Sequence, residues 1–444
     1  MQITLLSKLF NPIIKKLPNE NKYLSKSQKL LLYCNLISPS SFGTYTIMPI
    51  LQRSLDKLIV LINKEMEFIN AQKITMPSLG RSSIWKQSGR WDLLGKELYK
   101  FMDRDSKEMC LQPTHEEEVT SLLSTFQPLS TKDMPILLYQ ITPKFRNEVA
   151  PKYGLLRGRE FLMKDLYSFD CDESSAMLTY ERVVQQYHNL FQQLDVKFIC
   201  VDADSGGMGG SLSHEFHIPM SSGEDTVLLC NKCHKGFNEE LKKKDNLSNC
   251  CRDSSCSGSL ESTQAVEIGH CFMLGDKYTK TFDLHYYNLK EEKRNFVMGC
   301  YGIGVTRLLS ACIESLSDDK HIRWPQKIAP FRVSVLLQKN GARDYPSEEL
   351  KAKILNSLVE NFKTNSLCPS DILLDDSNYT VGKKLTNSNV IGIPWAIIVK
   401  DNEVLETVDI YGKETYFLPI EDAISAINGN CKHPLENSIK FVEK

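Results

Sequence analysis

Hydrophobic residues recur every three or four positions from Pro49 to about Gln72, which predicts a long amphipathic helix. Its apolar positions are Ile50, Leu51, Leu55, Leu58, Ile59, Ile62, Met66 and Ile69. The short segment Ile74–Pro77 follows, is typical of an extended strand, and ends at a proline. A long helix leading into such a segment is consistent with an element used for packing or for dimer formation.

Continuous apolar runs predict strands at Ile136–Ile141 and Glu160–Phe169. The polar loop between them contains Pro151 and Gly154, so we expect an antiparallel pair with a long connection. A helix is predicted at about residues 174–194. One face of it carries Met177, Tyr180, Val184, Tyr187, Leu190 and Phe191.

A glycine-punctuated strand at Met298–Gly304 runs directly into an apolar helix at Val305–Glu314. Proline dipeptides at Trp324-Pro325 and Ala329-Pro330 then mark a boundary. Beyond it the pattern alternates between strand and helix, with strands at Val333–Leu337, Ile372–Leu374 and Trp395–Val399 and a helix at Glu348–Phe362. About one hundred residues of this kind predict a small α/β domain.

The chain has 444 residues, of which 41% are hydrophobic and 25% charged, as is typical of a globular protein of two or three domains. No apolar run is long enough for a membrane span. The net charge of −1 gives no global sign of a nucleic-acid binder. A local basic track would still suffice, because affinity depends on the lysines and arginines in contact with phosphate.

The N-terminal segment up to about Cys34 is basic and amphipathic, with Glu20 as its one acidic residue. Its basic residues are Lys8, Lys15, Lys16, Lys22, Lys26 and Lys29. This composition predicts an organelle targeting segment at residues 1–35, although such segments favour arginine and none precedes Arg53. The alternative is a basic arm or first helix of the folded protein.

Five of the 14 cysteines gather in one segment: Cys230, Cys233, Cys250, Cys251 and Cys256. The others are scattered, which favours a reducing compartment over a disulfide scaffold. Cys230, Cys233, Cys251 and Cys256 are candidate ligands of a tetrahedral zinc ion. The four-residue spacing of the second pair is unusual, and Cys250 is an alternative to its neighbour. A loop of free thiols, or a site that has lost its metal, is the other interpretation.

Four separated segments carry candidate chemistry. Lys144–Glu148 with Leu155–Phe161 supplies arginines that can grip phosphate or carboxylate, and a phenylalanine that can stack on a purine. Gln112–Glu118 places a carboxylate beside a hydroxyl, which suits an ammonium group. It is not a zincin helix, because Val119 stands where the second histidine is needed. Taken singly, these two segments also fit a salt-bridged loop and a helix N-terminus.

The other two segments are rich in glycine. Ser205–Phe216 contains four glycines that allow close backbone approach to a ligand, followed by His214 and Glu215. Gly302–Arg307 places an arginine about one turn into a helix. It lacks the lysine and hydroxyl residue of a Walker loop, so any phosphate binding is of another kind.

In this order and spacing, the segments resemble the class II aminoacyl-tRNA synthetases, and most closely the prolyl-tRNA synthetase family. The helix ending at Pro77 resembles motif 1, the dimer element; Phe145–Phe161 resembles motif 2; Gly302–Arg307 resembles motif 3. Three further strings are specific to the prolyl branch, namely Pro113–Glu116, Ser213–Phe216 and Met298–Tyr301. The resemblance extends from about residue 40 to the C-terminus.

The resemblance implies an α+β fold: a class II antiparallel sheet flanked by helices at residues 36–329, and a C-terminal α/β anticodon-binding domain at 330–444. It implies ATP-dependent ligation of proline to tRNA(Pro) through a prolyl-adenylate, with Mg²⁺ on the phosphates. A homodimer in the mitochondrial matrix is expected.

The resemblance also implies roles for single residues. Arg146 would hold the α-phosphate and the proline carboxylate, and Glu148 would read the adenine amino group. Phe161 would stack on adenine, while Arg157 and Arg307 would grip the terminal phosphates beside the Gly302 and Gly304 backbone. Thr114 and Glu116 would hold the proline nitrogen, His214 would close the pocket, and Cys300 would line it without acting as a nucleophile.

Two features depart from the family pattern. Only about forty residues separate Ser222–Asp225 from Ile268–His270, so the cysteine-rich insert at about 226–266 leaves no room for the editing domain of bacterial relatives. We therefore expect no cis editing, as in the mitochondrial branch. Ser377 stands where relatives usually have an arginine after Asp375 and Asp376, which puts one anticodon contact in doubt.

Two alternatives stay open. The first is a synthetase for another amino acid such as threonine, although the cysteine and histidines that would hold a zinc ion in a threonyl pocket are absent. The second is a catalytically silent paralogue, although such proteins normally lose the arginines that persist here as Arg146, Arg157 and Arg307.

Overall fold

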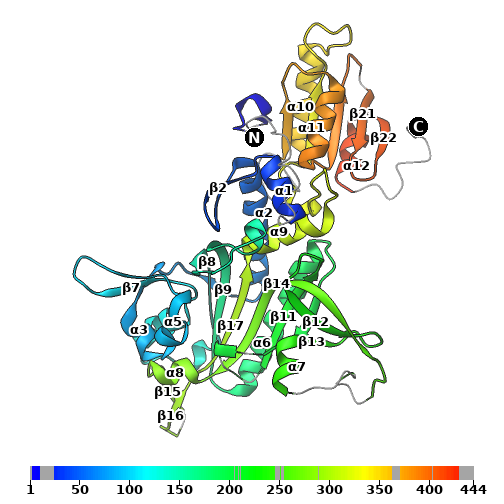
Figure 1. Ribbon diagram of the computed structural model, residues 1–444. Coiled ribbons are helices and arrows are strands. Elements are labelled where there is room, and N and C mark those ends of the chain that lie inside the picture. Colours follow the sequence, from blue (N-terminus) through cyan, green and yellow to red (C-terminus); the bar gives the residue numbers. More distant parts are fainter. Residues whose placement is uncertain are drawn as a thin grey trace.

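The computed structural model describes residues 3–10, 25–204, 206–208, 210, 212–245, 251, 255–288, 290–362, 371–402 and 404–429. They form a large domain, a small lobe on its side and a C-terminal domain (Figure 1). Among these residues, no helix has the length and apolar character needed to cross a bilayer.

A nine-stranded sheet forms the centre of the large domain. Its order is β11 (Leu212–Pro219), β10 (Ile199–Asp202), β13 (Gly236–Asn238), β12 (Asp225–Cys230), β14 (Leu260–Gly275), β17 (Val297–Gly304), β9 (Glu160–Asp170), β8 (Ile136–Phe145) and β4 (Gln72–Lys73). Neighbours are antiparallel except for β10–β13 and β4–β8. The predicted pair of strands is the β8–β9 hairpin, and the predicted antiparallel sheet is confirmed.

Helices α2 (Pro49–Phe68), α6 (Glu173–Gln193) and α9 (Val305–Leu316) pack together against one face of this sheet. The α6 N-terminus is capped by Asp172, whose side chain accepts from the Ser175 N–H at 2.8 Å. The predicted first helix ends four residues earlier than expected, because Asn70 adopts a left-handed conformation with φ of 60°. These three helices do not cover the opposite face of the sheet.

The described part of the predicted targeting segment is folded with the domains. Helix α1 (Lys26–Tyr33) buries Leu30 and Leu31 in the main core, and the Ser27 N–H donates to the Glu314 carboxylate. Strand β1 (Thr4–Leu5) pairs with the C-terminal sheet, while residues 11–24 lie outside the described part. A boundary at residue 35 would remove a core helix, so residues 25–35 fit the alternative of a first helix of the folded protein.

The small lobe contains β5 (Leu79–Arg81), β6 (Lys100–Met102), β7 (Glu108–Leu111), α3 (Ser82–Gln87), α4 (Arg90–Leu93), α5 (Glu116–Ser124), α8 (Lys277–Thr281), β15 (His285–Tyr287) and β16 (Lys293–Asn295). Its own apolar core, which includes Trp85, Trp91 and Phe296, continues onto Tyr167 of β9 and Met298 of β17. The lobe therefore packs on the edge of the face that α2 and α6 do not cover.

The C-terminal domain has a six-stranded sheet in the order β1, β19 (Ile372–Asp375), β18 (Val333–Leu337), β20 (Trp395–Val399), β21 (Val404–Asp409) and β22 (Glu414–Pro419). The inner strands are parallel and β21 and β22 are antiparallel. Helices α10 (Glu348–Phe362), α11 (Val381–Ile391) and α12 (Ile420–Ile427) complete it. The strands and helix predicted after Pro330 are all present, and β1, α11, the β21–β22 hairpin and α12 add to them.

Candidate active site

A cavity of about 630 Å³ opens on the free face of the large sheet, between the sheet and the small lobe. Of the eleven residues predicted to bind ATP or proline, ten line it. They are Thr114, Glu116, Arg146, Glu148, Arg157, Phe161, Cys300, Gly302, Gly304 and Arg307. Segments separated by almost two hundred residues of sequence therefore meet at one place.

Strand register explains the convergence. Gly302 of β17 pairs with Asp165 of β9, and Gly304 pairs with Met163 two residues further along. A Cβ at Gly302 would meet only the Met163 sulfur, at 3.9 Å, so the missing side chain leaves the cavity floor open. Arg307 follows in the first turn of α9, which places its guanidinium at the end of the same strand.

One end of the cavity is positively charged. The Arg146 guanidinium carbon lies 5.3 Å from the Phe161 ring centroid, and burial and the charge of Arg307 both lower the Arg146 pKa. Arg307 donates from Nε to the Leu156 carbonyl at 2.9 Å and from Nη1 to the Glu267 carbonyl at 3.1 Å. Two guanidiniums held close together and directed into one cavity suit an anion with several negative oxygens.

Arg157 is engaged by two carboxylates beside this end. Its Nη2 lies 2.9 Å from Glu148 Oε2, and its Nη1 forms an ion pair with Glu224. Lys152 Nζ also reaches Glu224, at 2.7 Å. A carboxylate oxygen can accept several hydrogen bonds, so Glu148 retains acceptor capacity toward a ligand.

The other end of the cavity is small and holds a fully buried carboxylate. Glu116 accepts from Thr114 Oγ1 at 2.7 Å, from Cys300 Sγ at 3.1 Å and from Arg90 Nη1 at 3.0 Å. Burial alone would raise the Glu116 pKa, but Arg90 and these hydrogen bonds lower it overall, so the group is an ionised acceptor. Burial and the Glu116 charge raise the pKa of Cys300 well above its ordinary value, which keeps the thiol protonated.

Some residues of the site escaped sequence prediction. Arg90 follows Gly89, which has a φ of 76°, and only the folded lobe brings it to Glu116 and to Glu117, at 3.1 Å. Asp165 lines the cavity floor and forms an ion pair with Lys144, whose Nζ lies 2.7 Å from Asp165 Oδ1. Lys144 belongs to the segment Lys144–Glu148, which was singled out from the sequence for Arg146. Nothing in the local pattern around Arg90 distinguishes it from a surface residue.

The structure does not bring His214 into the cavity. His214 of β11 pairs with Cys271 of β14, and residues opposite each other in an antiparallel pair share one face. That face belongs to α6: His214 Nδ1 lies 2.7 Å from the Tyr180 hydroxyl. His270, one position before Cys271, lines the cavity instead and stacks on Phe272 at 3.7 Å between ring centroids.

Acidic groups lie near Arg307: Glu267 lines the cavity, and Asp225 lines an adjoining pocket that Glu267 and Arg307 also line. The Glu267 N–H donates to Asp225 Oδ2 at 3.2 Å. Burial raises the pKa of Asp225, and the neighbouring charge of Glu267 raises it further. Burial would also raise the pKa of Glu267, but its hydrogen bond to His270 and the charges of His270 and Arg307 lower it overall.

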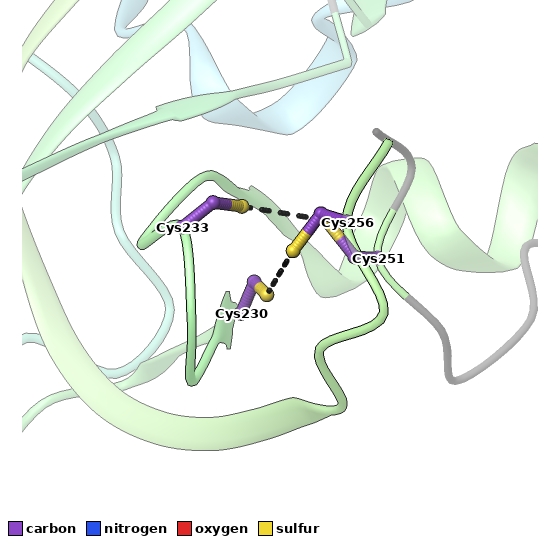
Figure 2. A group of neighbouring side chains, drawn as sticks. All are labelled: Cys230, Cys233, Cys251 and Cys256. Atoms are coloured by element: carbon purple, nitrogen blue, oxygen red, sulfur yellow. Dashed lines mark hydrogen bonds between the residues drawn. The ribbon is translucent and has the colours of Figure 1, made fainter. Parts of the chain in front are cut away.

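The predicted metal ligands lie together outside this cavity. Cys230, Cys233, Cys251 and Cys256 come from two facing loops, and their four sulfurs all lie within 4.8 Å of one another (Figure 2). Cys250 lies outside the described residues. Ser377 is also away from the cavity: its hydroxyl donates to Asp375 Oδ1 at 2.5 Å, at the end of β19.

Two family models match the chain. The tRNA synthetase class II core domain (G, H, P, S and T) matches residues 99–316, and the anticodon binding domain matches residues 341–430. The probable mitochondrial proline–tRNA ligase of Rattus norvegicus is 41% identical over 410 residues, covering 91% of this chain and 85% of the relative. The proline–tRNA ligase of Anaplasma phagocytophilum is 36% identical, covering 95% of this chain and 99% of the relative.

Among solved structures, the prolyl-tRNA synthetase of Giardia lamblia in complex with prolyl-adenylate is similar, with a TM-score of 0.72. It is 17% identical, and the match covers 92% of this chain and 81% of that one. At this identity the likeness concerns the fold. The agreement extends over both domains.

Proposed function

Because this chain belongs to the proline–tRNA ligase family of class II aminoacyl-tRNA synthetases, we propose that proline and ATP react in the cavity between β9, β17 and the small lobe. The enzyme ligates proline to tRNA with ATP, through a prolyl-adenylate, and it is of the mitochondrial type. The observation that carries the site assignment is the convergence of ten predicted residues on one cavity with a cationic end and a buried carboxylate at the other.

The small end is proposed to bind proline. The protonated ring nitrogen would donate to the ionised Glu116 and to Thr114 Oγ1, whose mutual 2.7 Å hydrogen bond fixes both oxygens. Arg90 balances part of the Glu116 charge and orients it. Cys300 fills the wall as a protonated thiol, so it contributes shape and one hydrogen bond and no covalent chemistry.

The cationic end is proposed to bind ATP. Adenine would stack on Phe161 beneath Arg146, with its amino group donating to Glu148. The proline carboxylate attacks the α-phosphorus and pyrophosphate departs. Arg146 neutralises charge that develops on the α-phosphoryl oxygens, while Arg157 and Arg307 hold the departing pyrophosphate. The terminal ribose hydroxyl of the tRNA then attacks the prolyl carbonyl, and AMP leaves. Both steps depend on positioning and charge stabilisation.

We place Mg²⁺ on the phosphates near Glu267 and Asp225. The Glu267 N–H donates to Asp225 Oδ2 at 3.2 Å, and burial together with the charge of Glu267 raises the Asp225 pKa, so a carboxylate pair at this place fits a hard divalent cation. When bound, Mg²⁺ supplies further neutralisation of phosphate charge. We also propose a homodimer built on α2, whose end carries the exposed Phe68, location in the mitochondrial matrix, and zinc at the cysteine cluster.

ATP–pyrophosphate exchange, measured one amino acid at a time, tests the proposal. We expect exchange with proline and none with threonine, and a loss of at least about 100-fold in Arg146→Ala, since this arginine stabilises developing charge. Exchange with threonine alone would show a different synthetase. An absence of exchange with every amino acid would show a silent paralogue. Undiminished exchange in Arg146→Ala would remove its assigned role.

A further inference from the structure

The cysteine cluster closes the end of a strand pair. Strand β12 runs from Asp225 to Cys230 and pairs along its whole length with β14, from Ala265 to Leu260. Cys230 ends β12 and Cys233 lies on the loop that follows it, while Cys251 and Cys256 lie on the segment that enters β14. The four side chains thus face each other across the open end of the ladder (Figure 2).

The sulfur positions fit one tetrahedral ion. Cys230 and Cys256 have their sulfurs 3.6 Å apart, and Cys233 and Cys251 have theirs 3.4 Å apart. A zinc–sulfur bond of about 2.3 Å places tetrahedral ligands about 3.8 Å from each other. A disulfide would need about 2.05 Å, and none of these four cysteines forms one.

The backbone of the first loop is shaped around its sulfur. The His234 N–H donates to the Cys230 carbonyl at 3.1 Å, and the Lys232 N–H points to Cys230 Sγ at 3.4 Å. His234 closes this tight turn with a φ of 59°. Backbone N–H groups directed at a cysteine sulfur stabilise its thiolate form, which is the form that binds metal.

The second loop is equally constrained. The Cys251 N–H donates to the Gly258 carbonyl at 3.2 Å, which closes the loop that carries Cys256. A Cβ at Gly258 would lie 2.2 Å from Cys230 Sγ, so only glycine lets the two loops approach. Asn231 Nδ2 further donates to Ser259 Oγ at 2.9 Å across the gap.

The far end of the same strand pair lies beside the active-site cavity, where Glu224 and Asp225 line an adjoining pocket together with Arg307. Glu224, which binds Arg157 and Lys152, directly precedes β12, and Asp225 begins it. Glu267 of β14 donates its N–H to Asp225 there. Five strand steps of about 3.3 Å separate Asp225 from Cys230, or about 17 Å.

We infer that a zinc ion bound by Cys230, Cys233, Cys251 and Cys256 clamps β12 to β14 and thereby holds Glu224, Asp225 and Glu267 in place at the phosphate end of the cavity. The ion is structural, because four protein ligands leave no open coordination position. Its effect on ATP rests on the function proposed for the cavity, whereas its binding does not. Loss of the ion would loosen the acidic wall around Arg157 without touching Thr114, Glu116 or Cys300.

Metal analysis of the full-length protein tests the site. We expect one zinc per chain, and replacement by cobalt should give the visible absorption of tetrahedral thiolate coordination. Cys251→Ser and Cys256→Ser should lose the zinc, while the matched control Cys250→Ser should keep it. A metal-free protein, disulfides among these four cysteines, or iron in place of zinc would each overturn the zinc assignment. Zinc retained in Cys251→Ser and lost in Cys250→Ser would overturn this ligand set.

Exchange kinetics test the clamp. In Cys256→Ser we expect the KM for ATP to rise roughly two- to fivefold, the effect of weakening a half-exposed ion pair, with the KM for proline unchanged. An unchanged KM for ATP in a zinc-free, folded variant would contradict the inference that zinc clamps the strand pair, while the zinc site itself would stand. Exchange with proline absent in the wild type, with zinc present, would instead contradict the proposed function alone.

Discussion

At the small end of the cavity, two adjacent glutamates differ in pKa and in role because their surroundings differ. Glu116 and Glu117 are both buried and both bind Arg90 Nη1, at 3.0 and 3.1 Å. Burial raises the pKa of Glu117, whereas Arg90, Thr114 and Cys300 outweigh burial at Glu116 and lower its pKa. Only Glu116 lines the cavity. It is therefore the acid that can bind a cationic substrate, and Glu117 is a positioning residue for Arg90.

Glu116→Gln should raise the KM for proline about 10- to 100-fold, because a hydrogen bond to a charged group contributes about 1.5–3 kcal/mol. The KM for ATP should change little, since Phe161 and Arg307 lie at the other end. Exchange kinetics at saturating ATP measure this. Glu117→Gln is the matched control, and an equal loss of proline affinity in both variants would assign the effect to Arg90 and not to Glu116.

Asp170 should give the protein a specific pH dependence. It is buried at the end of β9, accepts from Thr179 Oγ1 at 2.8 Å, and has no partner for its second oxygen among the described residues. Burial raises its pKa to about 6. Between pH 4 and 6 the folded state then holds a proton that the unfolded state has released, so stability falls as pH rises through this window.

Asp170→Asn should remove this contribution. Thermal midpoints measured from pH 4 to pH 6.5 should show a smaller decline in the variant than in the wild type. The comparison uses the difference between the two proteins, which cancels the titration of other groups. Parallel curves would show that Asp170 is ionised throughout this range in the folded state.

At the scale of elements, hydrophobic periodicity predicted the main helices and strands. It could not predict which side chains face the cavity, because that depends on strand register and on the tertiary structure. Helices α2, α6 and α9 and strands β8 and β9 were predicted from their long apolar faces or runs, and β17 was predicted from its glycine-punctuated apolar run. The prediction placed His214 in the cavity, but His270 lines it. Successive residues of a strand point to opposite faces, and only the β11–β14 pairing, in which His214 lies opposite Cys271, shows that His214 points away from the cavity. Arg90 was missed because it reaches Glu116 through the tertiary structure of the lobe.

Helix α1 gives the element scale its own prediction. Leu31 is fully buried between α1 and the main core, within the stretch predicted as a targeting segment. Leu31→Ala should lower the free energy of unfolding by about 2–4 kcal/mol, as for other buried leucines. Denaturant unfolding followed by a probe of the large domain measures it, with the half-buried Leu32→Ala as a milder control. An unchanged free energy of unfolding would favour the prediction that residues 25–35 belong to a targeting segment.

At the scale of the whole molecule, the short insert is a less specific sign of a mitochondrial enzyme than expected from the sequence. The short insert was taken to indicate a mitochondrial enzyme, yet the bacterial relative from Anaplasma phagocytophilum is matched over 99% of its length by this chain. A large insert between the motifs would leave part of that relative unmatched. The short form is therefore shared with a bacterial relative, and identity of 41% to the rat mitochondrial ligase is the stronger indication.

A buried ion pair joins the large domain to the C-terminal domain, and we expect tRNA charging to depend on it more strongly than adenylate formation does. Lys57 of α2 forms an ion pair with Asp371, next to β19, and donates to the Ala329 carbonyl at 2.5 Å. Both side chains are almost fully buried, so removing one partner leaves an uncompensated charge at a cost of about 3–5 kcal/mol. Lys57→Met should therefore loosen the C-terminal domain while leaving the cavity, which contains neither residue, intact.

In Lys57→Met we expect tRNA prolylation to fall much more than ATP–pyrophosphate exchange, because only prolylation needs the domain predicted to bind the anticodon held in place. The double variant Lys57→Met with Asp371→Leu should recover prolylation, since two apolar groups leave no buried charge unpaired. Lys293→Met, which breaks the exposed pair with Asp283, is the control and should change neither activity. Equal losses of exchange and prolylation in Lys57→Met, unrepaired in the double variant, would show that the pair supports folding of the large domain and not the arrangement of the two domains.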